Sequence, residues 1–174
     1  MTSSAIEARR GDARRTTNFV VNLPLGKNAF LRDWVASGVY AVRSGRPFTV
    51  NQSNNNVGTN MTGLPNQTGD PSYPGTVDRW FDPSVFTPVA SGTFGNEQRN
   101  QLRGPGFQSF DLTVQRMIRF NTRYVLTLRV DAFNLFNTTN FGLPARNISG
   151  GDVATITALS GDARITQLAI RFGF

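Results

Sequence analysis

Five segments of this chain alternate apolar and polar residues with a period of two, the pattern of β-strands that are apolar on one face. They cover residues 16–23, 34–50, 107–120, 124–136 and 164–174. The connections alternate short and long: those at 24–32, 51–106, 121–123 and 141–163 have nine, 56, three and 23 residues. Since antiparallel neighbours can be joined by tight turns, this order predicts an antiparallel up-and-down meander of about five strands.

The composition agrees with an all-β fold. Among 174 residues Lys occurs once and Glu twice, whereas Phe occurs 14 times. The solvent faces of helices are normally rich in Glu and Lys, and aromatic and β-branched residues suit strands. Apolar residues make up only 39% of the chain, so a generous core with two apolar layers is not expected.

The chain contains neither histidine nor cysteine. Disulfides, thiolate zinc sites, thiol nucleophiles and imidazole bases are therefore excluded within these residues. Asp111 and Asp131 are a weak candidate for an acid pair, because nothing near them in the sequence marks a substrate pocket. We predict no enzyme activity, no catalytic residue, no cofactor and no metal site.

The net charge of +7 comes almost entirely from arginine. One tight basic run, formed by Arg9, Arg10, Arg14 and Arg15, lies in the polar N-terminal segment over residues 1–15 and has no interleaved aromatic residues. A dedicated nucleic-acid binder gathers its basic residues on one element or face. We therefore expect no nucleic-acid partner.

No apolar run is long enough for a membrane-spanning helix or a signal peptide, but strands can also cross a membrane. Outer-membrane barrels have short periplasmic turns, long extracellular loops, and strands that are apolar toward lipid and polar toward the lumen. Residues 16–174 are predicted to form an open, curved part of such a transmembrane β-barrel. Its long extracellular loops cover about residues 51–106 and 141–163, and Asp82 followed by Pro83 predicts one helical turn over 82–86.

The polar faces of the predicted strands carry charged residues that would line the lumen, and aromatic residues cluster at the strand ends, as interfacial girdles require. Arg129 is a candidate cross-strand partner of Asp111. Arg116 falls on the apolar side, where we expect its stem to snorkel outward or a local bulge to move it. The predicted lumen-facing residues are Arg43, Asp111, Arg129, Asp131 and Arg171.

Several motifs resemble the C-terminal barrel segment of TonB-dependent outer-membrane receptors, and are most similar to the Oar-like branch, whose members carry a carboxypeptidase-regulatory-like domain. They are Gly-Thr-Phe-Gly-Asn at 92–96, Arg-Asn-Gln-Leu-Arg-Gly-Pro-Gly at 99–106, Phe-Asp-Leu-Thr at 110–113 and Asp-Ala-Phe-Asn-Leu-Phe-Asn at 131–137, with Phe174 at the end. Residues 19–26, 44–50 and 78–82 match the same family in the right order. The resemblance covers nearly everything from about residue 14 to 174.

The resemblance implies a larger bacterial outer-membrane receptor, with a signal peptide, a plug domain and a barrel of about 22 strands. Such receptors bind a scarce nutrient and import it with energy from TonB, which would be contacted through an N-terminal part absent from this sequence. The implied partners are outer-membrane lipid, the barrel-assembly machinery, TonB and an unknown nutrient ligand. The last strand resembles the β-signal that the assembly machinery reads, carried by Leu168, Ile170, Phe172 and Phe174.

Five strands cannot close a barrel, and unpaired edges are costly in lipid, so the chain alone is not expected to transport. Two alternatives stay open at this point. A soluble or secreted β-sandwich binding module would recognise carbohydrate through loop aromatics, and would purify from the soluble fraction. An outer-membrane lipase or protease would need catalytic residues from outside this sequence.

Overall fold

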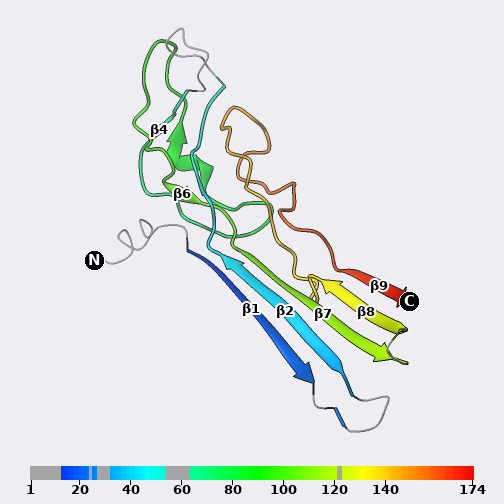
Figure 1. Ribbon diagram of the computed structural model, residues 1–174. Helices are drawn as coiled ribbons and strands as arrows, with labels where there is room; N and C mark the ends of the chain where they lie inside the picture. Colours follow the sequence, from blue (N-terminus) through cyan, green and yellow to red (C-terminus); the bar gives the residue numbers. More distant parts are fainter. Residues whose placement is uncertain (1–12, 24, 27–31, 54–62, 121–122) are drawn as a thin grey trace. The chain divides into compact units, whose positions relative to one another are not determined.

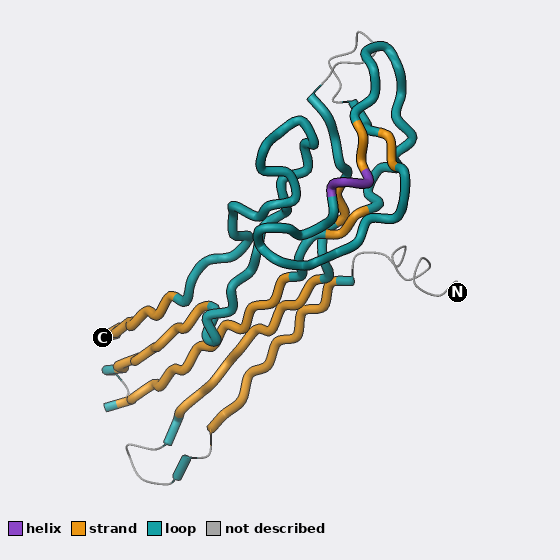
Figure 2. The backbone as a smooth tube through the Cα atoms, turned by 180° about the vertical axis from the view of Figure 1, so that it is seen from behind, coloured by secondary structure: helices purple, strands orange, loops and turns teal. Residues whose placement is uncertain are grey.

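The computed structural model describes residues 13–23, 25–26, 32–53, 63–120 and 123–174. They belong to two compact units (Figures 1 and 2). The sheet unit comprises Arg14–Arg43, Phe107–Asn140 and Gly161–Phe174, and the loop unit comprises mainly Ser44–Gly106 and Phe141–Ser160. Most of the polar N-terminal segment predicted over residues 1–15 lies outside the described residues. Within the described residues no helix is both long and apolar enough to cross a membrane.

The sheet unit is one antiparallel sheet of five strands, which Figure 2 shows side by side in orange. The strands follow each other in chain order, which confirms the all-β meander. They are β1 (Arg14–Leu23), β2 (Trp34–Arg43), β7 (Phe107–Arg119), β8 (Val125–Phe133) and β9 (Ile165–Gly173). Within the described residues β1 and β9 each have one neighbour, so the sheet is open at both edges.

Two strands end at least three residues before the sequence pattern predicts. The second ends at Arg43 instead of residue 50, because the chain then passes Gly45 and Pro47 into the loop unit. The fourth ends at Phe133 instead of residue 136. The next residue, Asn134, has a φ of 49°, which a strand cannot accommodate.

The register brings the predicted apolar sides of the five strands onto one face of the sheet. Phe19, Gly38, Leu112, Ala132 and Thr166 lie in one cross-strand row, and the next row on the same face is Val21, Ala36, Val114, Val130 and Leu168. We call this side, which also includes Leu23, Trp34, Tyr40, Phe110, Ile118, Leu126, Leu128, Ile170 and Phe172, the apolar face. The other side carries Asn18, Ser37, Asp111, Gln115, Arg129 and Arg171 and is the polar face.

One glycine helps to fix the pairing of β1 with β2. Gly38 lies opposite Phe19, and a Cβ atom added at Gly38 would lie 2.6 Å from Cε1 of the Phe19 ring. That ring therefore covers the glycine and stacks on Phe110, with 6.3 Å between the centroids. Phe110 in turn stacks on Phe136 at 5.4 Å. An aromatic ring over a strand glycine is a recognised device for setting register.

The loop unit has a small core of its own. Its strands pair as β3 (Pro47–Phe48) with β6 (Leu102–Arg103) and β4 (Asn66–Gln67) with β5 (Phe86–Thr87). A 3₁₀ helix, η1 (Pro83–Val85), starts at its N-cap Asp82, as the Asp-Pro signal predicts. The buried core residues come from both long connections between sheet strands: Phe48, Val50, Phe81, Phe86, Leu102 and Ala154.

Candidate functional site

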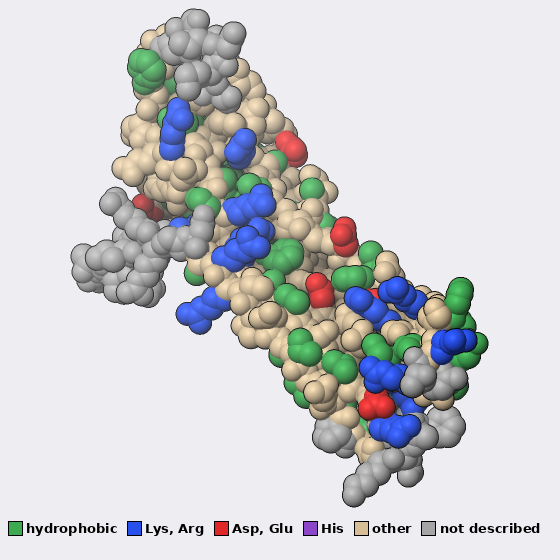
Figure 3. All heavy atoms as spheres, viewed as in Figure 1, with side chains coloured by type: hydrophobic (Ala, Val, Ile, Leu, Met, Phe, Trp, Pro, Cys, Tyr) green, Lys and Arg blue, Asp and Glu red, His purple; other side chains and the backbone are tan. Residues whose placement is uncertain are grey.

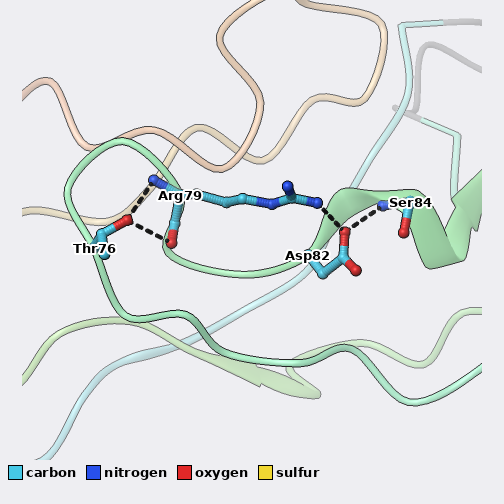
Figure 4. A network of polar contacts seen from close by, with 4 residues as sticks. All are labelled: Thr76, Arg79, Asp82 and Ser84. Carbon is cyan, nitrogen blue, oxygen red and sulfur yellow. Dashed lines mark hydrogen bonds and ion pairs between the residues drawn. The ribbon is translucent and has the colours of Figure 1, made fainter.

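The Arg-Trp-Phe-Asp stretch at 79–82 organises the loop unit. The Asp82 carboxylate accepts hydrogen bonds from the Ser84 backbone N–H at 3.1 Å and from the Arg79 guanidinium at 2.5 Å (Figure 4). These two donors hold the pKa of Asp82 below its usual value. Thr76 Oγ accepts from the Arg79 N–H and donates to the Arg79 carbonyl, both at 3.1 Å. The Arg79 side chain is therefore engaged by Asp82, while its backbone closes a turn with Thr76.

Trp80 joins the two long connections. Its indole N–H donates to the Arg103 carbonyl at 2.8 Å, and its backbone N–H donates to the Ala154 carbonyl at 2.8 Å. The next residue, Phe81, is fully buried and packs on Phe48 with 5.6 Å between ring centroids. Arg103 donates in turn to the Gly45 carbonyl at 3.1 Å. These motif residues build the scaffold of the loop unit.

Asn96 fixes a second segment of the loop unit beside β4. Its side-chain Oδ1 accepts from the Gln67 backbone N–H at 2.6 Å, and its Nδ2 donates to the Gln67 carbonyl at 3.2 Å. Its own backbone N–H donates to Oδ1 of Asn66 at 3.2 Å. One side-chain amide thereby satisfies both backbone groups of Gln67, as a neighbouring strand would.

A polar hollow of about 400 Å³ opens to solvent between the segment at 67–70 and the segment at 96–101. We call it the amide hollow, and it is lined by residues 67–70, Asn96, Gln98 and Gln101. Its volume lies within the range of small-molecule sites, but its lining is far more polar than is usual for them. Asn96 and Gln101 lie in motifs that carry the family resemblance, but the sequence did not mark the hollow as a site, because polar loop side chains have no periodicity. The amide-rich run at 96–101 is the signal that points to them.

Glu97 points away from solvent, between two residues that line the amide hollow. It is 4% exposed, and its Oε1 accepts from the Val50 backbone N–H at 2.9 Å. Oε2 is buried and has no hydrogen-bond partner among the described residues. Burial raises the pKa of Glu97 to about 7, against the opposing effect of the Val50 hydrogen bond.

All the residues predicted to face the lumen lie on the polar face of the sheet. Figure 3 shows arginine side chains near the strands on the side of the sheet unit turned to the viewer. The predicted pair of Arg129 with Asp111 does not form, because the register places Arg129 opposite Gln115. Arg129 instead pairs with Asp131, two residues along the same face, at 2.8 Å. Arg43 lies over the Phe107 ring, 5.2 Å from its centroid, and Arg171 lies opposite Thr127.

Two motifs noted in the sequence meet where β8 ends. Oδ1 of Asp111 accepts from the Asn134 backbone N–H at 2.8 Å. The Asn134 side chain donates to the carbonyls of Thr138 and Asp162 and accepts from the Thr138 N–H. Asp111 therefore serves as the acceptor that closes a turn.

The apolar face is largely uncovered in the last strand. Leu168, Ile170, Phe172 and Phe174, the residues predicted to form the assembly signal, are 56 to 93% exposed, and the register places the first three on this face. Arg116 also lies on this face and remains in unbroken register with Trp34 and Leu128, so the expected bulge is absent. Its guanidinium lies 5.8 Å from the Trp34 ring centroid, and the residue is 8% exposed instead of reaching out to solvent.

In the described part of the chain, no three acidic side chains come together in an arrangement that could hold a metal ion. A family model described as an outer membrane beta barrel domain matches residues 11–167. The match extends from before β1 into β9 and includes the loop unit. No curated protein and no solved structure matches the chain.

Proposed function

The chain belongs to the family of outer membrane β-barrel domains, and from that premise we propose that it is the C-terminal barrel segment of a bacterial TonB-dependent receptor of the Oar-like branch. The whole receptor would bind a scarce nutrient at the cell surface and import it. The loop unit would face the outside, and the polar face of the sheet would line the lumen. The protein is placed in the outer membrane by its family.

The observation that most supports a membrane barrel is the apolar face that all five strands share. Its rows run from β1 to β9, with Arg116 as the one charged residue in the row that joins Trp34 to Leu128, and β9 exposes Leu168 and Ile170 by 80% and 77%. A soluble β-sandwich would cover such a face with a second sheet. Family membership and the exposed apolar rows therefore favour a wall that faces lipid over the soluble alternative.

The motifs that resemble the receptor family support the receptor assignment, because motifs far apart in the chain contact one another. The segment at 44–50 pairs with the segment at 99–106 through β3 and β6, and Asp111 bonds to Asn134. The two open sheet edges require further strands, since each unpaired backbone group in lipid costs several kcal/mol. The chain alone is therefore not proposed to transport.

The assignment is tested by reading the genomic DNA upstream of Met1. We expect an open reading frame continuous with this chain that encodes a plug domain and a signal peptide. A promoter and an in-frame stop codon directly upstream would contradict the receptor assignment. Membrane fractionation tests the location separately, with the protein expected in the outer-membrane fraction.

A further inference from the structure

We propose that the carboxyl group of Glu97 is a pH-sensitive switch, which joins residues 48–52 to residues 95–101 when it is neutral and lets them separate when it is ionised. We call residues 95–101 the Glu97 segment. The inference concerns the loop unit alone, and it goes beyond the receptor assignment without depending on it. It rests on how the Glu97 segment is attached to its two neighbours and on the burial of one carboxyl group.

On one side the Glu97 segment is attached to β4 and the residues before it. Asn96 binds both backbone groups of Gln67, and the Glu97 backbone N–H donates to the Pro65 carbonyl at 3.2 Å. The two stretches approach so closely that a Cβ atom added at Gly95 would lie 2.2 Å from the Pro65 carbonyl oxygen. These contacts involve backbone and amide groups, which do not ionise, so this attachment does not depend on pH.

On the other side the attachment to residues 48–52 depends on the Glu97 side chain. Its Oε1 atom accepts a hydrogen bond from the Val50 backbone N–H at 2.9 Å. Close by, the Asn100 backbone N–H donates to Thr49 Oγ at 2.8 Å. The pairing of β3 with β6 does not extend this far. The carboxyl group therefore joins the two stretches at a point that strand pairing does not reach.

The surroundings of Glu97 favour its neutral form. The residue is 4% exposed, and its Oε2 atom is buried and has no hydrogen-bond partner among the described residues. Neither of the bonded stretches, 48–52 and 64–67, contains an acidic or basic side chain. Of the nearby basic residues, Arg99 is exposed and Arg103 donates to a backbone carbonyl. A buried charge without a partner is strongly unfavourable, so the closed arrangement accommodates the neutral acid, in agreement with the raised pKa of Glu97.

The direction of the switch follows from this environment. Ionisation brings a charge that is stable only in water, and separation from residues 48–52 gives the carboxylate access to water. Because the pKa of Glu97 is raised from 4.5 to about 7 in the closed arrangement, opening becomes easier as the pH rises through this range. The Glu97 segment stays bonded to β4 through Asn96, so the separation occurs on the Val50 side. The segment also supplies one wall of the amide hollow, so the switch acts on that wall.

The test is hydrogen exchange resolved to single backbone amides, on the full chain in outer-membrane vesicles at pH 5 and pH 8. Exchange rates are converted to protection factors, because exchange itself is faster at the higher pH. We expect the protection of the Val50 and Asn100 amides to fall by up to about 70-fold from pH 5 to pH 8. At pH 8 both should be less protected than the Gln67 amide, which Asn96 binds. A local opening exposes little surface, so low concentrations of urea should leave their exchange unchanged.

Two variants separate the role of Glu97 from that of other groups. Glu97→Gln keeps an acceptor for the Val50 N–H and cannot ionise, so its protection factors should be the same at both pH values. Asp70→Asn removes an exposed acid of the loop unit and is the matched control, in which the fall should persist. The near-ultraviolet spectrum of the two tryptophans reports whether each variant has folded.

Three results would overturn the proposal. Protection at Val50 and Asn100 that is equal at pH 5 and pH 8 would show that ionisation does not open the contact. A fall that persists in Glu97→Gln would assign the pH dependence to another group. Exchange at Val50 that rises with urea in parallel with exchange at Phe81, in the core, would show that the whole loop unit unfolds instead of opening locally.

Discussion

The carboxylate of Asp111 on β7 accepts a hydrogen bond of 2.8 Å from the backbone N–H of Asn134, 23 residues further along the chain. The bond lies where β8 gives way to a turn, and Asn134 is the residue with the positive φ of 49°. One carboxylate therefore stabilises the point at which the chain leaves the sheet. The Ser109 hydroxyl also donates to the same oxygen at 3.2 Å, which orients it.

We predict that Asp111→Ala lowers the free energy of unfolding by about 2 kcal/mol, because a charged acceptor for a backbone N–H is lost. Asp111→Asn keeps an oxygen at the same place and should lose less than half as much. Urea titration of the protein in lipid vesicles, followed by fluorescence, measures both values. Equal losses in the two variants would show that the charge, and not the turn-closing bond, is what matters.

The contact between Gly38 and Phe19 leads to a coupled prediction. Gly38→Ala should destabilise the sheet by about 1 to 2 kcal/mol, because the new Cβ atom displaces the Phe19 ring and disturbs its stack on Phe110. Phe19→Leu in the same chain should remove most of that added cost. The measurement is a double-mutant cycle from urea titrations, and additive effects of the two substitutions would contradict the contact.

Glu97 makes the stability of the loop unit depend on pH. Its pKa is raised from 4.5 to about 7 in the folded protein, so between these values the folded state binds more protons than the unfolded state. The free energy of unfolding should therefore fall as the pH rises from 4.5 to 7, by at most about 3 kcal/mol, and level off above pH 7. Urea titration at pH 5 and pH 8, followed by Trp80 fluorescence in a Trp34→Phe background, measures the change.

Glu97→Gln supplies the control for this pH dependence. Its amide keeps an acceptor for the Val50 N–H and cannot ionise, so this part of the pH dependence should vanish. Above pH 7 the variant should be more stable than the unaltered protein. A Glu97→Gln protein that is less stable at pH 8 would show that the ionised carboxylate is stabilising in the folded state.

A fourth prediction concerns the apolar face. Val130→Arg places a cation in a central row of that face and should cost about 2 to 4 kcal/mol in a bilayer. Arg116→Met removes the existing cation and should change stability by less than about 1 kcal/mol. Arg116 lies opposite Trp34, the first residue of β2, and we expect a cation near a strand terminus to cost little; its contact with the indole ring offsets the rest.

Both substitutions are measured by urea titration in lipid vesicles and again in detergent micelles. The penalty of Val130→Arg should be larger in the bilayer. Equal stability of Val130→Arg and the unaltered protein in vesicles would contradict contact between the apolar face and lipid.

Local patterns allowed the sequence to predict the strands and their faces. Side chains alternate strictly along a strand, so Leu112 and Val114 belong to one face wherever the strand is placed. The Asp82-Pro83 signal for a helical turn is equally local. Partners across strands depend on register to the residue, and the predicted pair of Arg129 with Asp111 was wrong for that reason.

Such local patterns could not predict the core of the loop unit. Phe48, Phe81, Leu102 and Ala154 have no common period, and their burial follows from contacts between residues as much as 106 positions apart. The same is true of the amide hollow, where Asn96 and Gln67 meet through one side-chain amide.

The sequence by itself therefore determined the class of fold, the order of the strands and the face of each side chain, because these follow from spacing along the chain. Only the tertiary structure decided which residues pair and which polar side chains, such as Glu97, are buried. Those outcomes depend on how distant segments compete for the same hydrogen bonds and the same buried space.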